Sequence, residues 1–246
     1  MDCKALDTVK CQKTVQQGVK KLYKQLINTL FPPLCCHCQT REWVYVCPVC
    51  LETVFSYPDV CFYCRNRSWS QNVCEECVSI LDRIIVCFSY RWAIKSAIKA
   101  LKYKDYKAII QPLIQKALRS QPLDQYDSSN TVITYIPMHR RKQYRKRWYN
   151  QGSLLAKELS KQTWLPCVNL CKKIKLTKSQ TKFSRNKRKM NVYNTFTLSK
   201  SLANHIKHVI IVDDIVTTWS TLSTVAWLLK KHYSLTSVVW YCLARQ

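Results

Sequence analysis

Eight of the chain's 15 cysteines form four Cys-x-x-Cys pairs between residues 35 and 77. The pairs are Cys35/Cys38, Cys47/Cys50, Cys61/Cys64 and Cys74/Cys77. Thiolates at this spacing are typical of structural zinc sites, and eight of them complete two tetrahedral sites with no position left for water. A redox dithiol also uses Cys-x-x-Cys, but four copies in so short a segment favour metal. We predict two structural zinc ions, with pairing of successive motifs preferred over crossed pairing.

A second group of residues that could do chemistry is the adjacent pair Asp213 and Asp214. These two aspartates are the only acidic residues of the sequence after Glu158. They follow the apolar run 209–212 and precede a hydroxyl-rich segment that opens a predicted helix. The hydroxyls belong to Thr217, Thr218, Ser220 and Thr221. Hydroxyls and free N–H groups at a helix N-terminus bind anions, and carboxylates accept hydrogen bonds from sugar hydroxyls. The pattern predicts a phosphorylated-sugar site; the alternative is that the two acids only cap the helix.

The formal net charge is +26, from 40 basic and 14 acidic residues, so polyanions are the expected partners. Two basic tracts carry much of this charge, at 139–147 and 172–189. Their candidate contacts to nucleic acid or pyrophosphate are His139, Arg140, Arg141, Arg145, Arg147, Lys182, Arg185 and Arg188. Aromatic residues beside the first tract, such as Tyr149, favour unpaired bases over duplex. The second tract is predicted to be a long loop, either a lid or a groove for a nucleic-acid backbone; a solvated face is the alternative for both.

From residue 84 onward, apolar runs alternate with helical patterns. We expect strands at 84–88, 131–136, 209–212 and 237–243, and helices around 94–101, 109–117, 154–159 and 222–229. Unbroken apolar strands separated by helices predict an α/β fold with a parallel sheet, whose ligands bind at the carboxyl ends of the strands. The predicted organisation is a basic amphipathic helical segment (1–30), a double zinc ribbon (31–80) and the α/β domain (84–246). Without a signal-peptide or membrane-helix pattern, we expect a cytoplasmic protein.

At these motifs the chain resembles a known family. The segment 209–221, VIIVDDIVTTWST, looks like the loop that binds 5-phosphoribosyl 1-pyrophosphate (PRPP) in type I phosphoribosyltransferases. Together with the cysteine pairs, the Ile-Pro-Met-His segment at 136–139 and Tyr-Asn-Gln at 149–151, it resembles the ComF family of competence-associated proteins.

The resemblance implies a phosphoribosyltransferase-like fold in which Asp213 and Asp214 bind the ribose hydroxyls. The four loop hydroxyls would hold the 5-phosphate, and Mg²⁺ would arrive on the pyrophosphate. It also implies a role in uptake and processing of transforming single-stranded DNA, with helicase-type protein partners. The hypotheses are therefore a DNA-uptake factor, which we prefer, an active Mg²⁺-dependent phosphoribosyltransferase with an unknown acceptor, and an adaptor that grips a protein through its zinc module.

The chain departs from the family by carrying tryptophan where relatives carry glycine. The positions are Trp92, Trp148, Trp164, Trp219 and Trp240, in a chain with 8 Trp and only 2 Gly. Tryptophan neither lets phosphate approach the backbone nor adopts a positive φ at low cost. One explanation is that UGA codons, which encode glycine in some lineages, have been read as tryptophan. The alternative is a degenerate PRPP loop in a protein retained for DNA binding.

Overall fold

The computed structural model describes residues 33–42, 44–54, 81–104, 106–138, 149–174, 195–216 and 219–245 of the chain. The predicted helix of 1–30, the cysteine pairs Cys61/Cys64 and Cys74/Cys77, and most of both basic tracts lie outside these residues.

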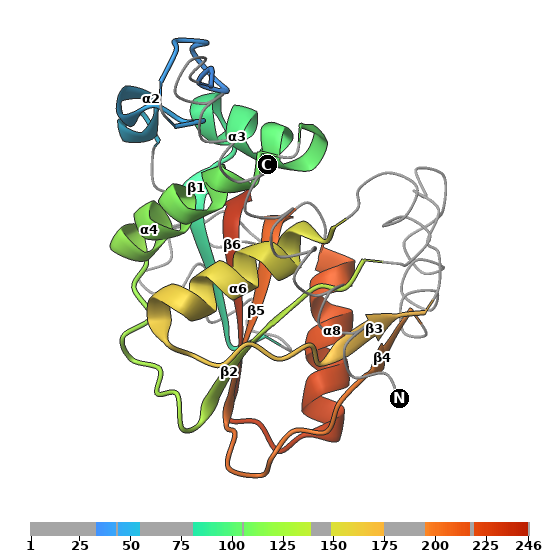
Figure 1. Ribbon diagram of the computed structural model, residues 1–246. Helices are drawn as coiled ribbons and strands as arrows, with labels where there is room; N and C mark the ends of the chain where they lie inside the picture. Colours follow the sequence, from blue (N-terminus) through green and yellow to red (C-terminus); the bar gives the residue numbers. More distant parts are fainter. Residues whose placement is uncertain are drawn as a thin grey trace, which may run out of the picture.

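A four-stranded parallel sheet forms the centre of the α/β domain (Figure 1). Its strands are β1 (Arg83–Ser89), β2 (Thr131–Tyr135), β5 (His208–Val216) and β6 (Ser237–Arg245), in the order β1-β6-β5-β2. All three pairings between neighbouring strands are parallel. The predicted parallel α/β architecture is therefore confirmed.

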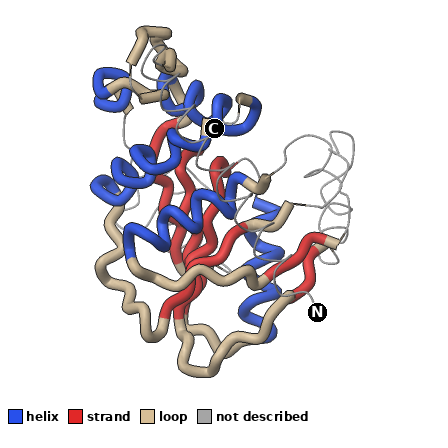
Figure 2. Tube along the Cα trace, viewed as in Figure 1, coloured by secondary structure: helices blue, strands red, loops and turns tan. Residues whose placement is uncertain are grey.

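The sheet is buried on both faces, which explains why its strands read as unbroken apolar runs. One face packs against α3 (Trp92–Tyr103), the 3₁₀ turn η2 (Lys107–Ile109), α4 (Ile110–Ser120) and α6 (Gln151–Thr163). The other packs against α8 (Trp219–His232) and the hairpin of β3 (Cys171–Lys173) and β4 (Phe196–Leu198). Alternation along β5 directs Ile210 and Val212 to the first face and Val209 and Ile211 to the second. Figure 2 shows the helices flanking the strands in this layered arrangement.

Helix α6 begins beside the carboxyl end of β2 and the Val212 carbonyl of β5. The Asn150 side chain caps the helix by accepting from the Gly152 N–H at 3.0 Å, and it also donates to the carbonyl of Ile136 at 2.9 Å. A Cβ on Gly152 would lie 3.5 Å from the Val212 carbonyl oxygen, so the helix backbone approaches β5 closely. The Asn-Gln-Gly segment therefore fixes the start of α6 against the edge of the sheet where a ligand is expected.

The first two cysteine pairs and the short helix α2 (Pro48–Glu52) fold together as a knuckle, which packs onto the α/β domain. His37 Nδ1 lies 3.2 Å from Ser96 Oγ of α3, and the Tyr45 and Tyr106 rings are 4.3 Å apart. Buried knuckle residues such as Val46 share one apolar core with α3 and α4. In Figure 1 the knuckle lies beside α3, at the end of the molecule toward which the strands run.

Three details differ from, or add to, the expectations. Strand β5 continues to Val216, so Asp213 and Asp214 lie within it rather than after it. The hairpin β3–β4 was not predicted, because three-residue strands give no readable period; Lys172 and Lys173 of the second basic tract belong to it. Trp92 and Trp164 adopt positive φ angles of 45° and 62°.

None of the helices in the described ranges has the length and apolar character needed to span a bilayer.

Candidate functional site

The first two cysteine pairs come together in the knuckle. The Sγ atoms of Cys35, Cys38, Cys47 and Cys50 all lie within 4.8 Å of one another. A tetrahedral Zn–S₄ site with bonds of about 2.3 Å requires S···S separations of about 3.8 Å, and the Cys38–Cys47 separation is 3.7 Å. The backbone N–H groups of Cys47 and Cys50 donate to the thiols of Cys35 and Cys47, each at 3.4 Å. The four cysteines fit a metal ion, in the preferred sequential pairing.

The neighbouring Cys36 and His37 do not belong to this cluster. The His37 ring is engaged with Ser96, and burial raises the pKa of the Cys36 thiol to about 12. Hydrogen bonding to Thr40, in contrast, lowers the pKa of Cys38 to about 6. Burial, however, also raises the pKa of Cys50, which is one of the four converging thiols, so the ligand set is identified by the convergence of the Sγ atoms and not by proton affinity.

The acidic pair lies near the carboxyl end of β5, where the fold predicts a ligand. Adjacent side chains of a strand point to opposite faces, and the partners of the two carboxylates reflect this. Asp214 forms an ion pair with a lysine of α3, whereas Asp213 interacts electrostatically with Cys242 of β6 and Lys173 of β3. The Asp213 carboxylate also accepts from the Asp214 N–H at 2.8 Å. The two acids are neighbours in sequence but occupy different surroundings.

Lys102, in the last turn of α3, forms an ion pair with Asp214, with Nζ 2.7 Å from Oδ2. Its side chain is 17% exposed and that of Asp214 is 12% exposed. The carboxylates in the pairs Lys116–Glu52 and Lys230–Asp82 are 74% and 36% exposed. The sequence pattern did not identify Lys102, because lysines occur throughout the helical segments and nothing in their spacing distinguishes a buried one.

Asp213 has an unusual proton affinity. Burial raises its pKa to about 8, and the charge of Asp214 contributes in the same direction. The amide of Asp214, Lys102 and Lys173 act in the opposite direction but do not offset burial. Tyr90, which follows β1, also has a raised pKa, through burial and then Asp214. A strongly perturbed carboxyl group at a strand end is characteristic of functional sites.

The predicted hydroxyl cradle is only partly described. Helix α8 begins at Trp219, immediately after the acidic strand, and Thr221 lies in its first turn. Thr217, Thr218 and the side chain of Ser220 lie outside the described part of the chain. The helix start is thus near the end of β5, but the hydroxyl contacts stay a prediction.

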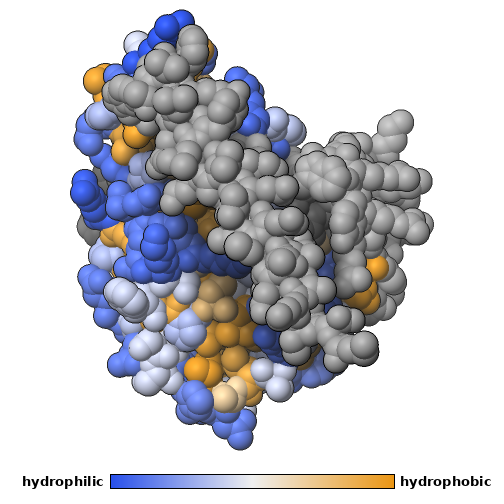
Figure 3. Space-filling view, in the orientation of Figure 1, coloured by the Kyte–Doolittle hydropathy of each residue, from blue (hydrophilic) through white to orange (hydrophobic). Residues whose placement is uncertain are grey.

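The basic contact residues from His139 to Arg147 and from Lys182 to Arg188 also lie outside the described residues. Tyr149, at the end of the first tract, is described and has a structural position. Its hydroxyl donates to the Leu101 carbonyl, and Lys107 Nζ lies 4.5 Å from the centre of its ring. Hydrophilic side chains cover much of the face that carries α4 and α6 (Figure 3).

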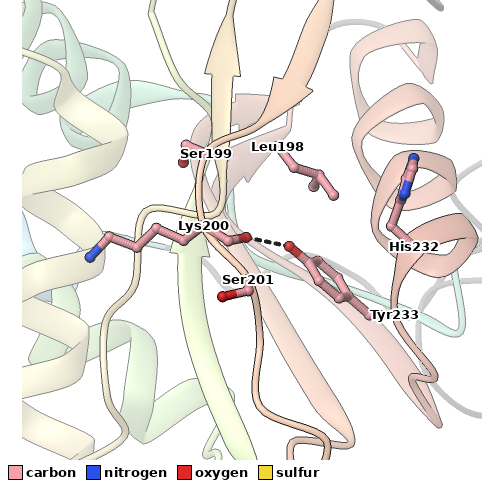
Figure 4. Close-up of a pocket in the computed structure, with 6 residues that line it drawn as sticks. All are labelled: Leu198, Ser199, Lys200, Ser201, His232 and Tyr233. Atoms are coloured by element: carbon pink, nitrogen blue, oxygen red, sulfur yellow. Dashed lines mark hydrogen bonds between the residues drawn. The ribbon is translucent and has the colours of Figure 1, made fainter.

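A surface hollow lies elsewhere, between the end of β4 and the C-terminal end of α8 (Figure 4). It is lined by Leu198, Ser199, Lys200, Ser201, His232 and Tyr233. The Tyr233 hydroxyl donates to the Lys200 carbonyl across it. The hollow shares no residue with the acidic pair, and its polar groups do not converge on a reacting centre.

Comparison with known proteins gives the following relatives. The chain is 27% identical to competence protein F of Haemophilus influenzae over 208 residues, covering 80% of this chain and 90% of that protein. It is 29% identical to the DNA utilization protein YhgH of Shigella flexneri, covering 66% of this chain and 72% of the relative. It is 35% identical to YhgH of Escherichia coli K12 over 116 residues, covering 46% and 48%. No family model matches the chain.

Proposed function

The chain belongs to the ComF family, and from that premise we propose that it acts in competence, in the uptake or processing of DNA. The observation that carries this proposal is the match to competence protein F along most of both chains. The relatives named DNA utilization protein support the same role. The large positive charge is consistent with a polyanionic partner.

Within this role, the α/β domain binds a phosphorylated ligand of the PRPP type. Support comes from the acidic pair near the carboxyl end of β5 and from the helix that begins just after it. Asp213 and Asp214 would accept from ribose hydroxyls, and Thr217, Thr218, Ser220 and Thr221 would hold the 5-phosphate. Mg²⁺, carried on the pyrophosphate, would offset its charge.

The basic tracts bind single-stranded DNA through its phosphates. Arg140, Arg141 and Arg145 are the test positions, because their side chains carry fixed charge and no acidic residue lies between them. Binding to phosphates releases counterions, so affinity falls steeply with salt.

Calorimetry with Mg²⁺–PRPP and with a single-stranded oligonucleotide tests both parts. We expect Asp213→Asn to lose PRPP binding and to keep oligonucleotide binding, while Asp124→Asn, at an exposed carboxylate, changes neither.

Alanine at the three arginines should reduce the salt slope of oligonucleotide binding by about 2, since each single-strand phosphate contact contributes about 0.7. Alanine at Lys157 and Lys161, exposed on α6, should leave the slope nearly unchanged. Oligonucleotide binding that is insensitive to salt would overturn the DNA proposal.

An active phosphoribosyltransferase is the second candidate, and the raised pKa of Asp213, which comes mainly from burial, favours it. In this reaction pyrophosphate leaves C1 of the ribose as an amine or base acceptor attacks. Release of pyrophosphate from Mg²⁺–PRPP only when an acceptor is added would support it.

An adaptor role is favoured by exposed apolar residues on the knuckle. Leu34, Val44 and Val49 are 44%, 43% and 74% exposed. A protein complex that survives nuclease treatment, from a chain that binds neither PRPP nor oligonucleotide, would support the adaptor.

We also propose that the knuckle's metal is zinc and that Cys61, Cys64, Cys74 and Cys77 hold a second zinc ion. Four thiolates per ion leave no open position, so both sites would be structural.

A further inference from the structure

The end of α3 is fixed by contacts on several sides. Ile98 and Leu101 are fully buried against the sheet, and the Leu101 carbonyl accepts from the Tyr149 hydroxyl. Ser96, earlier in the helix, meets His37 of the knuckle. These contacts fix the last turn of α3, so the Lys102 ammonium has a defined position beside Asp214.

A site with two adjacent carboxylates opposes the approach of an anion. Burial first, and then the charge of Asp214, raise the pKa of Asp213, so a second negative charge is already disfavoured beside Asp214. A phosphate group brought near them adds further negative charge in a poorly solvated place. One ammonium at 2.7 Å offsets the charge of Asp214 and reduces that repulsion.

We propose that Lys102 is a specificity-determining residue whose ammonium offsets the charge of Asp214, so that the acidic pair admits an anionic ligand. This inference rests on the proposed function, because it assumes that the pair binds a phosphorylated sugar. It assigns to α3 a role in the site that neither the sequence pattern nor the relatives' names contain.

The test uses ribose 5-phosphate as the probe and calorimetry on the full chain. Lys102→Met keeps the length of the side chain and removes its charge, and we expect affinity to fall about tenfold or more, the effect of about 1.4 kcal/mol. Lys102→Arg keeps the charge and should stay within about threefold of the wild-type affinity. Lys99→Met removes a charge from the exposed side of the same helix and is the control.

A second measurement distinguishes electrostatics from mere loss of structure. Carboxyl NMR should show the pKa of Asp213 rising in Lys102→Met, because Lys102 lowers it, and little change in the Arg variant. An unchanged affinity for ribose 5-phosphate, or an Asp213 titration that does not move, overturns the role of Lys102. A wild-type chain that does not bind the probe, while the Asp213 titration still responds to Lys102, overturns the proposed ligand instead.

A different observation carries a second inference. Trp92 has φ 45° at the start of α3 and is 65% exposed, and Trp164 has φ 62° after α6 and is 85% exposed. Bulky residues rarely adopt positive φ, whereas a left-handed residue after a helix is usually glycine. Because both indole side chains are largely exposed, their burial contributes little to offset the strain of the positive φ angles.

Two other tryptophans in the described part of the chain make contacts that are ordinary for this residue type. Trp240 is fully buried in β6 and donates to the Cys242 sulfur at 2.5 Å. Trp227 lies within α8, with Lys231 Nζ 4.7 Å from the centre of its ring. The sequence pattern placed Trp240 in one group with Trp92 and Trp164, but of these three only Trp92 and Trp164 have a positive φ angle.

We infer that positions 92 and 164 are glycine in the protein as its own host makes it, encoded by UGA codons. Trp92→Gly and Trp164→Gly should each raise the melting temperature, by about 2–4 °C if each relieves about 1 kcal/mol of backbone strain. Trp240→Gly, the control, should lower it, because it removes a buried side chain. Peptide masses from the native host should show glycine at 92 and 164. Tryptophan in those peptides, or variants that are both destabilised, would overturn the inference.

Discussion

The carboxyl groups of Asp213 and Asp214 respond differently to substitution because their partners differ. Asp213 has a pKa of about 8, against an ordinary value of 3.8, mainly through burial. A group with a raised pKa in the folded state stabilises the fold fully below its unfolded pKa and loses that contribution as pH rises through the folded value. We therefore expect the free energy of unfolding of the wild type to fall between about pH 4 and pH 8.

Asp213→Asn cannot ionise, so its urea-unfolding free energy should fall less than that of the wild type over the same range. Measurements at pH 5 and pH 8.5 check this. Asp124→Asn, at an exposed carboxylate, should follow the wild type. Parallel pH profiles for wild type and Asp213→Asn would contradict the raised pKa of this carboxyl group.

Asp214→Asn should lower the free energy of unfolding. It removes the partner of Lys102 and leaves a largely buried ammonium with a neutral amide, at a cost of about 1–3 kcal/mol. Urea unfolding at pH 7 measures the loss. The double variant with Lys102→Met should recover part of it, since no unpaired charge remains; a double variant as unstable as the sum of both would show that the two groups do not interact.

The cysteines of the knuckle also differ at the scale of single residues. Cys38→Ser should reduce the zinc content of the chain by one ion, because Cys38 is one of four converging thiols. Cys36→Ser is the matched control, two residues away and outside the cluster, and should keep the full zinc content. Atomic emission on purified protein gives both numbers, and equal loss in the two variants would mean that the ligand set is wrong.

At the scale of elements, the strands and main helices were predictable because the sheet is buried on both faces. The runs at 84–88 and 209–212 have no polar interruption, and each helix shows its apolar face in its spacing. The continuation of β5 through two aspartates was not predictable, since aspartate disfavours strands and only the pairing with β6 holds it extended. The contact of Lys102 with Asp214 joins residues more than a hundred positions apart and depends on how α3 packs.

The start of α6 makes a prediction at this scale. Asn150→Ala removes both the cap to Gly152 and the bond to the Ile136 carbonyl, and should cost about 1–2 kcal/mol. Asn150→Asp keeps the capping acceptor and loses the donor, so its loss should be smaller. Urea unfolding measures both. Equal losses would mean that the cap contributes nothing and that the bond to the Ile136 carbonyl alone positions the helix.

At the scale of the whole molecule, the knuckle and the α/β domain share an apolar core and an ion pair between Lys116 and Glu52 at 3.1 Å. Metal bound by the knuckle should therefore stabilise the sheet as well as the knuckle, because binding to the folded state shifts the common unfolding equilibrium. Removing metal with a chelator should lower the melting temperature of the chain by about 5 °C or more, the shift that about 2 kcal/mol produces at this size. Far-ultraviolet circular dichroism, which reports the sheet and helices, measures it. Cys38→Ser should melt near the chelated protein and Cys36→Ser near the untreated one. A chelated protein whose α/β domain melts as before would mean that the knuckle folds independently of the sheet.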